Sequence, residues 1–296
     1  MRPFERPTLS EVCSTRNIYS KGFESEQSTQ LVSQLLNTFS FRPRNNANMK
    51  TIGLLGGMSW ESSSLYYSHM NRAVRSRLGG THSCKSIMYS FDFAEIEKLQ
   101  ETDAWAALTD TLAEAAIGLR KAGAEGLLLC TNTMHKVAPE IESKAGLPVL
   151  HIADFTGQKI VEAGFEKVGL LATRYTMEHA FYKDRLVEKF GLEVLTPSAS
   201  ERTIVHDIIY EELVRGIIRE ESKKEYIKII DSLVARGAKC IILGCTEITL
   251  LIGEKDSPVP VFDTTALHCE GAIDWTLEPS DNLAANNAVD KHKPSN

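Results

Sequence analysis

Two short polar segments of the chain combine side chains that can donate or remove protons. Thr131-Asn132-Thr133 follows the apolar run Gly126–Cys130, and Cys245-Thr246-Glu247 follows the run Cys240–Gly244. Backbone N–H groups at the start of a following helix favour an anion such as a carboxylate. They also lower the pKa of a cysteine, so we expect the Cys245 thiolate to be available as a base. A single cysteine is often buried and inert, but its place between a strand end and Thr-Glu favours a chemical role.

The other cysteines and histidines fit structural roles. Alternation along a strand points Cys130 to the face opposite Thr131, so we interpret Cys130 as a packed wall residue. We interpret His135 as a helix-start residue that satisfies the backbone or its neighbours. No Cys-x-x-Cys pair or Cys/His cluster has zinc spacing, so no metal is expected. The cysteines without a polar partner in the sequence are Cys13, Cys84, Cys240 and Cys269.

Composition limits the kind of protein that can carry such a site. The chain is 43% hydrophobic and 24% charged, which is typical of globular proteins. Its 296 residues are enough for about two domains. A net charge of −6 argues against a nucleic-acid surface, and no apolar stretch is long enough for a membrane helix. Six scattered cysteines are too few for a disulfide framework. We expect a reduced, intracellular protein that acts on a small molecule.

Short apolar runs alternate with helical patterns along the chain, which indicates βαβ units, parallel sheets and the α/β class. The turn after the first run has Gly53, Gly56 and Gly57 but lacks the dinucleotide fingerprint, so no cofactor is expected. Predicted strands are 51–55, 87–92, 126–130 and 148–152, and predicted helices are 59–78, 104–121 and 134–144.

The second half of the chain repeats the first. Three apolar segments recur in one order at offsets of 112 to 116 residues, which predicts two similar α/β lobes with a ligand cleft at the carboxyl ends of their strands. Residues 49–150 with about 263–277 form the first predicted lobe, and residues 151–262 form the second. Residues 1–48 are expected to be a disordered extension, with a transit peptide as the alternative, and residues 278–296 a disordered tail.

Four motifs, in order, resemble the aspartate/glutamate racemase family over about residues 49–277. They are Gly56-Gly57-Met58-Ser59-Trp60-Glu61-Ser62, Cys130-Thr131-Asn132-Thr133-Met134-His135, Thr173-Arg174-Tyr175-Thr176-Met177 and Gly244-Cys245-Thr246-Glu247. The broad-specificity amino acid racemase branch is the most similar. The resemblance implies two pseudosymmetric lobes, an active site between them and no pyridoxal phosphate.

The resemblance also implies roles for single residues. Most of the family presents one cysteine on each lobe, whereas this chain has Thr131 in the first position, as the most similar branch does. We therefore expect Cys245 to act as the base and Thr131 as the proton donor, with L to D turnover favoured, on aspartate and/or glutamate. Glu247 stands where glutamate racemases have histidine, which argues against strict glutamate specificity. The expected substrate-binding residues are Met58, Gln100, Asn132, Thr133, Thr246 and Glu247.

The same sequence features are compatible with other functions. The same fold serves hydantoin racemases, maleate isomerases and arylmalonate decarboxylases, and the missing first cysteine would also suit a catalytically weak, ligand-binding descendant. We expect a cytoplasmic protein that binds a small amino acid and neither nucleic acid nor membrane, and the resemblance implies a homodimer or a higher homo-oligomer. Organelle targeting by residues 1–48 is the alternative location.

Overall fold

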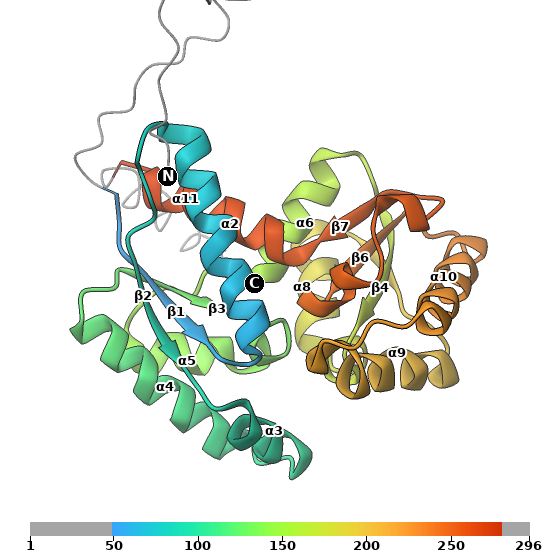
Figure 1. The fold of residues 1–296 in the computed structure, drawn as a ribbon, viewed down its shortest axis with the longest axis horizontal. Helices are drawn as coiled ribbons and strands as arrows, with labels where there is room; N and C mark the ends of the chain where they lie inside the picture. Colours follow the sequence, from blue (N-terminus) through green and yellow to red (C-terminus); the bar gives the residue numbers. More distant parts are fainter. Residues whose placement is uncertain (1–48, 280–296) are drawn as a thin grey trace, which may run out of the picture. The chain divides into compact units, whose positions relative to one another are not determined.

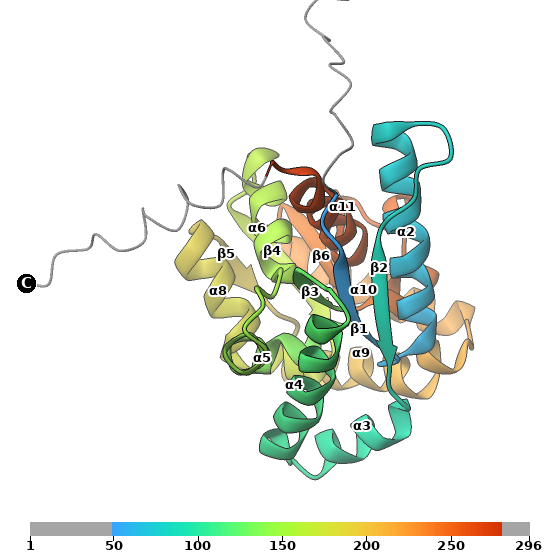
Figure 2. The same ribbon diagram turned by 90° about the vertical axis from the view of Figure 1, so that its left-hand side faces the viewer.

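The computed structural model describes residues 49–279, which form two parallel β-sheets flanked by helices (Figure 1 and Figure 2). The predicted α/β class is therefore confirmed, while the predictions for residues 1–48 and 280–296 lie outside the described residues. The first sheet has the order β2-β1-β3 and the second the order β5-β4-β6-β7, with every pair parallel. The strands are β1 (Ile52–Gly56), β2 (Ser86–Ser90), β3 (Gly126–Leu129), β4 (Lys167–Ala172), β5 (Glu193–Leu195), β6 (Cys240–Gly244) and β7 (Val261–Asp263).

Strand order repeats between the two sheets. β1 lies between β2 and β3 as β4 lies between β5 and β6, which agrees with the predicted repeat. The fourth strand differs, because β7 is a strand of the second sheet, whereas its counterpart in the first sheet is one bridge between Leu127 and Val149. The predicted strand 148–152 is therefore wrong. A helix, α6 (Ile152–Glu162), already begins there with the His151 side chain as its N-cap, and this shortens the extended segment.

The helix that follows β1 begins and ends where its sequence predicts. In α2 (Trp60–Leu78) the Ser59 side chain accepts from the Ser62 backbone N–H, and Gly79 ends the helix at a φ of 74°. The predicted helix 134–144 is instead a 3₁₀ turn followed by a separate helix. Pro139 lies in the first turn of that second helix, and a proline cannot continue a preceding helix because it lacks the N–H donor.

Helices cover both faces of the first sheet, and two apolar cores result. One core contains Leu55, Leu127 and Leu129, and the other contains Leu54 and Leu128, because neighbouring strand residues point to opposite faces. Since both faces are buried, the strands are almost continuously apolar. Helices of the first half are α3 (Phe93–Glu101), α4 (Trp105–Lys121), η2 (Thr133–Val137) and α5 (Ala138–Ala145).

The second sheet packs around a single apolar core, to which β4, β6 and their helices contribute. The last helix, α11 (Thr264–Leu277), follows β7 of this sheet but packs against both α2 and α6, and its residues Cys269 and Ile273 belong to a core of the first sheet. None of the helices in the described part is long and apolar enough to cross a membrane. The remaining helices are α7 (Arg174–Glu178), α8 (Ala180–Phe190), α9 (Ala199–Glu211), η3 (Leu213–Arg215), α10 (Glu220–Ala235), η4 (Thr246–Leu250) and η5 (Glu254–Asp256).

Candidate active site

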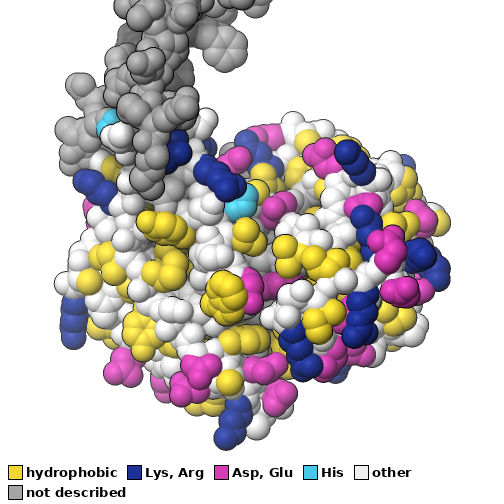
Figure 3. Space-filling model, viewed as in Figure 1, with side chains coloured by type: hydrophobic (Ala, Val, Ile, Leu, Met, Phe, Trp, Pro, Cys, Tyr) yellow, Lys and Arg dark blue, Asp and Glu magenta, His cyan; other side chains and the backbone are white. Residues whose placement is uncertain are grey.

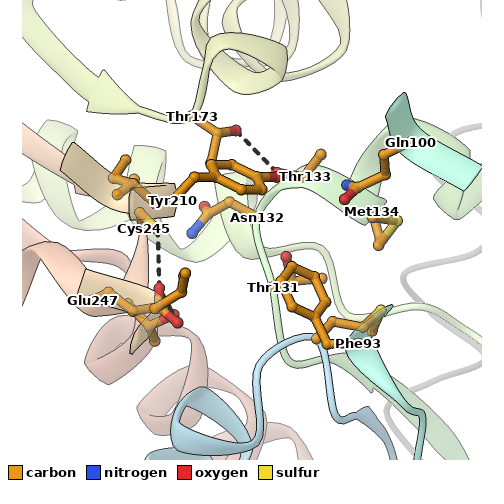
Figure 4. A pocket seen from close by; sticks show the side chains of 15 residues that line it. Phe93, Gln100, Thr131, Asn132, Thr133, Met134, Thr173, Tyr210, Cys245 and Glu247 are labelled. Carbon is orange, nitrogen blue, oxygen red and sulfur yellow. Dashed lines mark hydrogen bonds between the residues drawn. The ribbon is translucent and has the colours of Figure 1, made fainter. Parts of the chain in front are cut away.

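A pocket with about 440 Å³ of empty space collects residues from the ends of strands of both sheets (Figure 4). Thr131 follows β3, while Thr173 follows β4 and Cys245 follows β6. Carboxyl ends of parallel strands are where α/β proteins bind ligands. The structure brings all eight residues predicted for the site into the lining of this pocket: Met58, Gln100, Thr131, Asn132, Thr133, Cys245, Thr246 and Glu247.

Part of the lining was not predicted from the sequence. Thr173 had a detectable signal, because it directly follows an apolar strand as Thr131 does. Tyr210 had none, because it lies within α9 and reaches the pocket only through the way that helix packs. The other additional lining residues are Phe93, Met134, Ile209, Val214 and Gly244.

His135 holds the first polar segment in place. Its Nε2 accepts from the Ile152 backbone N–H at 3.2 Å, so its Nδ1 carries the proton and donates to the Thr131 carbonyl at 2.9 Å. Burial lowers the pKa of His135 to about 4, which keeps the ring neutral. The prediction that His135 satisfies the backbone at a helix start is confirmed. These two hydrogen bonds of His135 connect the backbone of Thr131 to the start of α6.

Cys130 points away from the pocket, as strand alternation predicted. Its side chain is fully buried in the core that contains Tyr66 and Cys269, and burial raises the pKa of the Cys130 thiol. The Cys130 carbonyl accepts a hydrogen bond from Ser62 Oγ at 2.9 Å. Cys130 is therefore a packing residue in this structure.

Cys245 has a raised pKa, which corrects the expectation of a thiolate favoured by the following helix. Burial is the largest cause, followed by the carboxylate of Glu247, to which Cys245 Sγ–H donates at 3.0 Å. Hydrogen bonds from the backbone of Glu247 and Thr246 act in the opposite direction and are outweighed. The following helix, η4, is a single 3₁₀ segment of five residues, and so short a helix has little dipole to oppose burial. The resting state of Cys245 is therefore the thiol.

Hydrogen bonds link residues near the first sheet to residues near the second around the pocket. Ser59 Oγ donates to Glu247 Oε1 at 2.6 Å, and Ser62 Oγ lies 2.8 Å from Thr246 Oγ1. The hydroxyls of Thr133 and Thr173 lie 3.0 Å apart (Figure 4). These buried contacts hold the second polar segment against the start of α2 and the first polar segment against Thr173, since a buried polar group without its partner is costly.

The pocket is electrostatically one-sided. Glu247 is the one charged side chain among the described lining residues, and the lining contains no Lys, Arg or His of the described part. Burial raises the pKa of Tyr210, and negative neighbours, among them Glu247, raise it further. The walls are otherwise apolar side chains and neutral hydroxyl and amide groups, so the pocket supplies hydrogen bonds and has no cation of its own.

Two buried amide oxygens of the lining lack a partner. Asn132 Nδ2 donates to Thr264 Oγ1 at 3.1 Å, which fixes the orientation of the amide, and its Oδ1 has no hydrogen bond. Gln100 Oε1 is likewise buried and unpaired. Both oxygens can accept hydrogen bonds from a ligand. Across residues 49–279, no group of three or more His, Cys, Asp or Glu side chains is arranged to hold a metal ion.

A thiol beside a carboxylate on one side, and a threonine that follows a strand of the other sheet, line one pocket at the strand ends, where α/β proteins bind small ligands. The chain belongs to the Asp/Glu/Hydantoin racemase family, whose profile matches residues 55–272, and racemases are isomerases. A broad-specificity amino-acid racemase of Bacillus subtilis is 22% identical over 246 residues, 76% of this chain and 98% of that protein.

Two solved structures each match 78% of the chain. One, from Yersinia pestis, is a candidate Asp/Glu racemase with 54% identity and a TM-score of 0.74, and the match covers 78% of this chain and 100% of that chain. The other, an aspartate racemase homologue from Pyrococcus horikoshii OT3, has 33% identity and a TM-score of 0.68 with the same coverage. The resemblance read from the four sequence motifs is therefore confirmed.

Proposed function

We propose that this protein is a cofactor-independent amino acid racemase that interconverts L- and D-aspartate and/or glutamate. The observation that supports this most is that Cys245 and Thr131, from the ends of different sheets, line one pocket. A substrate whose α carbon lies between them has one proton-transfer group on each face. Positioning of this kind supplies a large part of a catalysed rate.

In this proposal Cys245 removes the α proton and Thr131 supplies one to the opposite face. A threonine hydroxyl is a far weaker acid than a thiol, so the two directions are unequal and L to D turnover is favoured. The orphan oxygens of Asn132 and Gln100 accept from the substrate ammonium, and backbone and hydroxyl groups of Thr133 and Thr246 hold its α-carboxylate. Met58 forms an apolar wall, and Glu247 lies beside Cys245.

The charge of the lining favours a second candidate substrate class. An aspartate or glutamate side chain brings an additional carboxylate, and the described lining offers no cation to pair with it, whereas Glu247 repels it. Amino acids with neutral or basic side chains avoid that cost. The second candidate is therefore a racemase whose substrates include amino acids with neutral or basic side chains.

The test is a panel of L and D amino acids incubated with the purified protein in D₂O. Proton NMR reports the loss of the α proton, and chiral chromatography reports inversion. Turnover of aspartate or glutamate supports the main proposal, and turnover of neutral or basic amino acids alone supports the second candidate. Binding without exchange would favour a ligand-binding descendant, and turnover of a hydantoin with none of free amino acids would contradict both candidates.

Three accompanying properties are proposed with this function. Activity is independent of pyridoxal phosphate, so hydroxylamine should leave it unchanged. The protein is a homodimer, which light scattering of the purified chain would test. Its location is cytoplasmic, and imaging of the full chain beside a chain without residues 1–48 would reveal organelle targeting instead.

A further inference from the structure

One wall of the pocket belongs to neither of the two polar strand-end segments. It consists of Ile209 and Tyr210 of α9 and Val214 of η3. Figure 3 shows Lys, Arg, Asp and Glu side chains intermixed on the surface over α9 and α10, whereas these three wall residues are uncharged. The pocket side of α9 and η3 therefore presents apolar groups and one phenol.

The phenol of Tyr210 offers a hydrogen-bond donor to the pocket. Tyr210 is half-buried, and its contact within the described part of the chain is a ring contact, with no hydrogen bond from its hydroxyl to a described residue. Burial and negative neighbours raise its pKa, so the phenol keeps its proton at pH 7. The other hydroxyl among the lining residues without an assigned role is that of Thr173, and it already lies within hydrogen-bond distance of Thr133 and Thr176. The Tyr210 hydroxyl is therefore available to a ligand.

A row of aromatic rings holds the Tyr210 side chain in place. His206 lies one helical turn before Tyr210 on α9, and their ring centroids are 4.6 Å apart. His206 Nδ1 accepts from the Arg174 backbone N–H at 3.3 Å, and burial lowers its pKa, so a neutral ring is bound to the start of α7. Tyr175 packs edge-on against His206 with centroids 6.0 Å apart, and Trp105 of α4 packs against Tyr175 at 5.8 Å. Contacts with helices of both halves of the chain restrict the direction in which the phenol points.

We propose that Tyr210 is a specificity-determining residue of this pocket, whose hydroxyl donates a hydrogen bond to an oxygen at the end of the substrate side chain. His206 is the positioning residue that holds the Tyr210 ring. The substrates favoured by this contact are amino acids whose side chains end in a carboxylate or an amide. The inference rests on the proposed function, and it adds recognition of the side chain to the groups that hold the α-carboxylate and the ammonium.

The arrangement of the pocket leaves the wall of α9 and η3 for the substrate side chain. Cys245 and Thr131 take the two faces of the α carbon, and the polar strand-end segments hold its charged groups, so the remaining substituent meets the remaining wall. Ile209 and Val214 make the surroundings of the phenol apolar, and a hydrogen bond is stronger where less water competes for it. A side chain without an oxygen leaves the phenol unpaired when it binds, which costs affinity.

The first test compares two probes of similar length. One is L-glutamate or L-glutamine, whichever the wild-type protein turns over faster, and the other is L-norleucine, whose side chain has no oxygen. Tyr210→Phe keeps the ring and removes the hydroxyl, so kcat/KM for the oxygen-bearing probe relative to norleucine should fall by about threefold to tenfold. The loss should appear in KM more than in kcat, because this hydrogen bond is present before the chemical step as well as during it.

Tyr175→Phe is the matched control, because it removes a hydroxyl from the same row of rings and Tyr175 does not line the pocket. Its ratio of the two kcat/KM values should equal that of the wild-type protein. An unchanged ratio in Tyr210→Phe, or an equal fall in both variants, would overturn the role of the Tyr210 hydroxyl.

The second test addresses the positioning role of His206. His206→Ala removes both the ring beside Tyr210 and the acceptor for the Arg174 N–H, so the same ratio should fall by about twofold or more. His206→Phe keeps a ring and should restore most of the ratio. If His206→Ala lowers kcat/KM for both probes equally, or leaves the ratio unchanged, His206 does not position Tyr210 and this part of the inference is wrong.

Failure of the proposed function gives a different result from failure of this inference. If the wild-type protein turns over only one probe, or neither, the ratio is taken from Kd values measured by calorimetry with the same variants. A Kd ratio that falls in Tyr210→Phe while no amino acid is turned over would refute the proposed function and support recognition by Tyr210. Equal binding of both probes by the wild-type protein would overturn the inference.

Discussion

Cys130 and Thr131 are neighbours in the chain, and replacing each by alanine tests which of them is the second proton-transfer group. The Cys130 side chain is fully buried among apolar residues and does not line the pocket. Cys130→Ala should therefore cost about 1–2 kcal/mol in free energy of unfolding and leave racemisation within about twofold. Thr131 is half-buried and lines the pocket, so Thr131→Ala should change the free energy of unfolding by less than about 1 kcal/mol.

Catalysis should be lost in Thr131→Ala and kept in Cys130→Ala, which is the reverse of the order expected for stability. Loss of a general acid slows a reaction by about 100-fold to 10,000-fold, or about 3–5 kcal/mol in transition-state stabilisation. We expect Thr131→Ala to lose racemisation by that factor while Cys245 still exchanges the α proton of one enantiomer with D₂O. Cys245→Ala should lose exchange in both directions. Chiral chromatography measures racemisation, NMR in D₂O measures exchange of the α proton, and urea unfolding measures the stability of each variant. An inactive Cys130→Ala beside an active Thr131→Ala would refute the assignment.

Three further predictions follow from the site and the fold. Thr131→Cys places a stronger acid on the first lobe and should raise the D to L rate relative to the L to D rate, as measured from both enantiomers by chiral chromatography. Deletion of residues 1–48 should leave folding and racemisation intact, which circular dichroism and activity of the truncated protein would check against the full chain. The lowered pKa of buried His135 means that the unfolded chain binds more protons below about pH 6.5, so the contribution of His135 to stability is full above that pH and falls by up to about 3 kcal/mol as the pH approaches 4. Urea unfolding at pH 7 and pH 4.5 should show this loss, and a His135→Asn variant should lose less.

Much of the fold could be predicted because strand and helix signals were local. The run 126–130 is apolar throughout, as a strand buried on both faces must be, and Ser59 and Gly79 mark the two ends of α2 by their capping chemistry. Two segments failed, one because of tertiary contacts and one because of a proline that the helical pattern had outweighed. The run 148–152 looks extended, yet its neighbours allow it only one bridge before α6 begins, and Pro139 divides one expected helix into two.

The sequence by itself determined which groups could carry the chemistry, since strand ends, small polar residues and a repeated order of segments are all readable from residue types and spacing. Tertiary structure decided how those groups behave. Burial and the hydrogen bond to Glu247 hold Cys245 as a thiol with a raised pKa, and the sequence pattern had suggested the reverse. Packing of α9 brought Tyr210 into the pocket, and the approach of α2 to η4 placed Ser59 on Glu247. Desolvation and contact between distant segments cause these effects, and neither is a property of a local stretch of sequence.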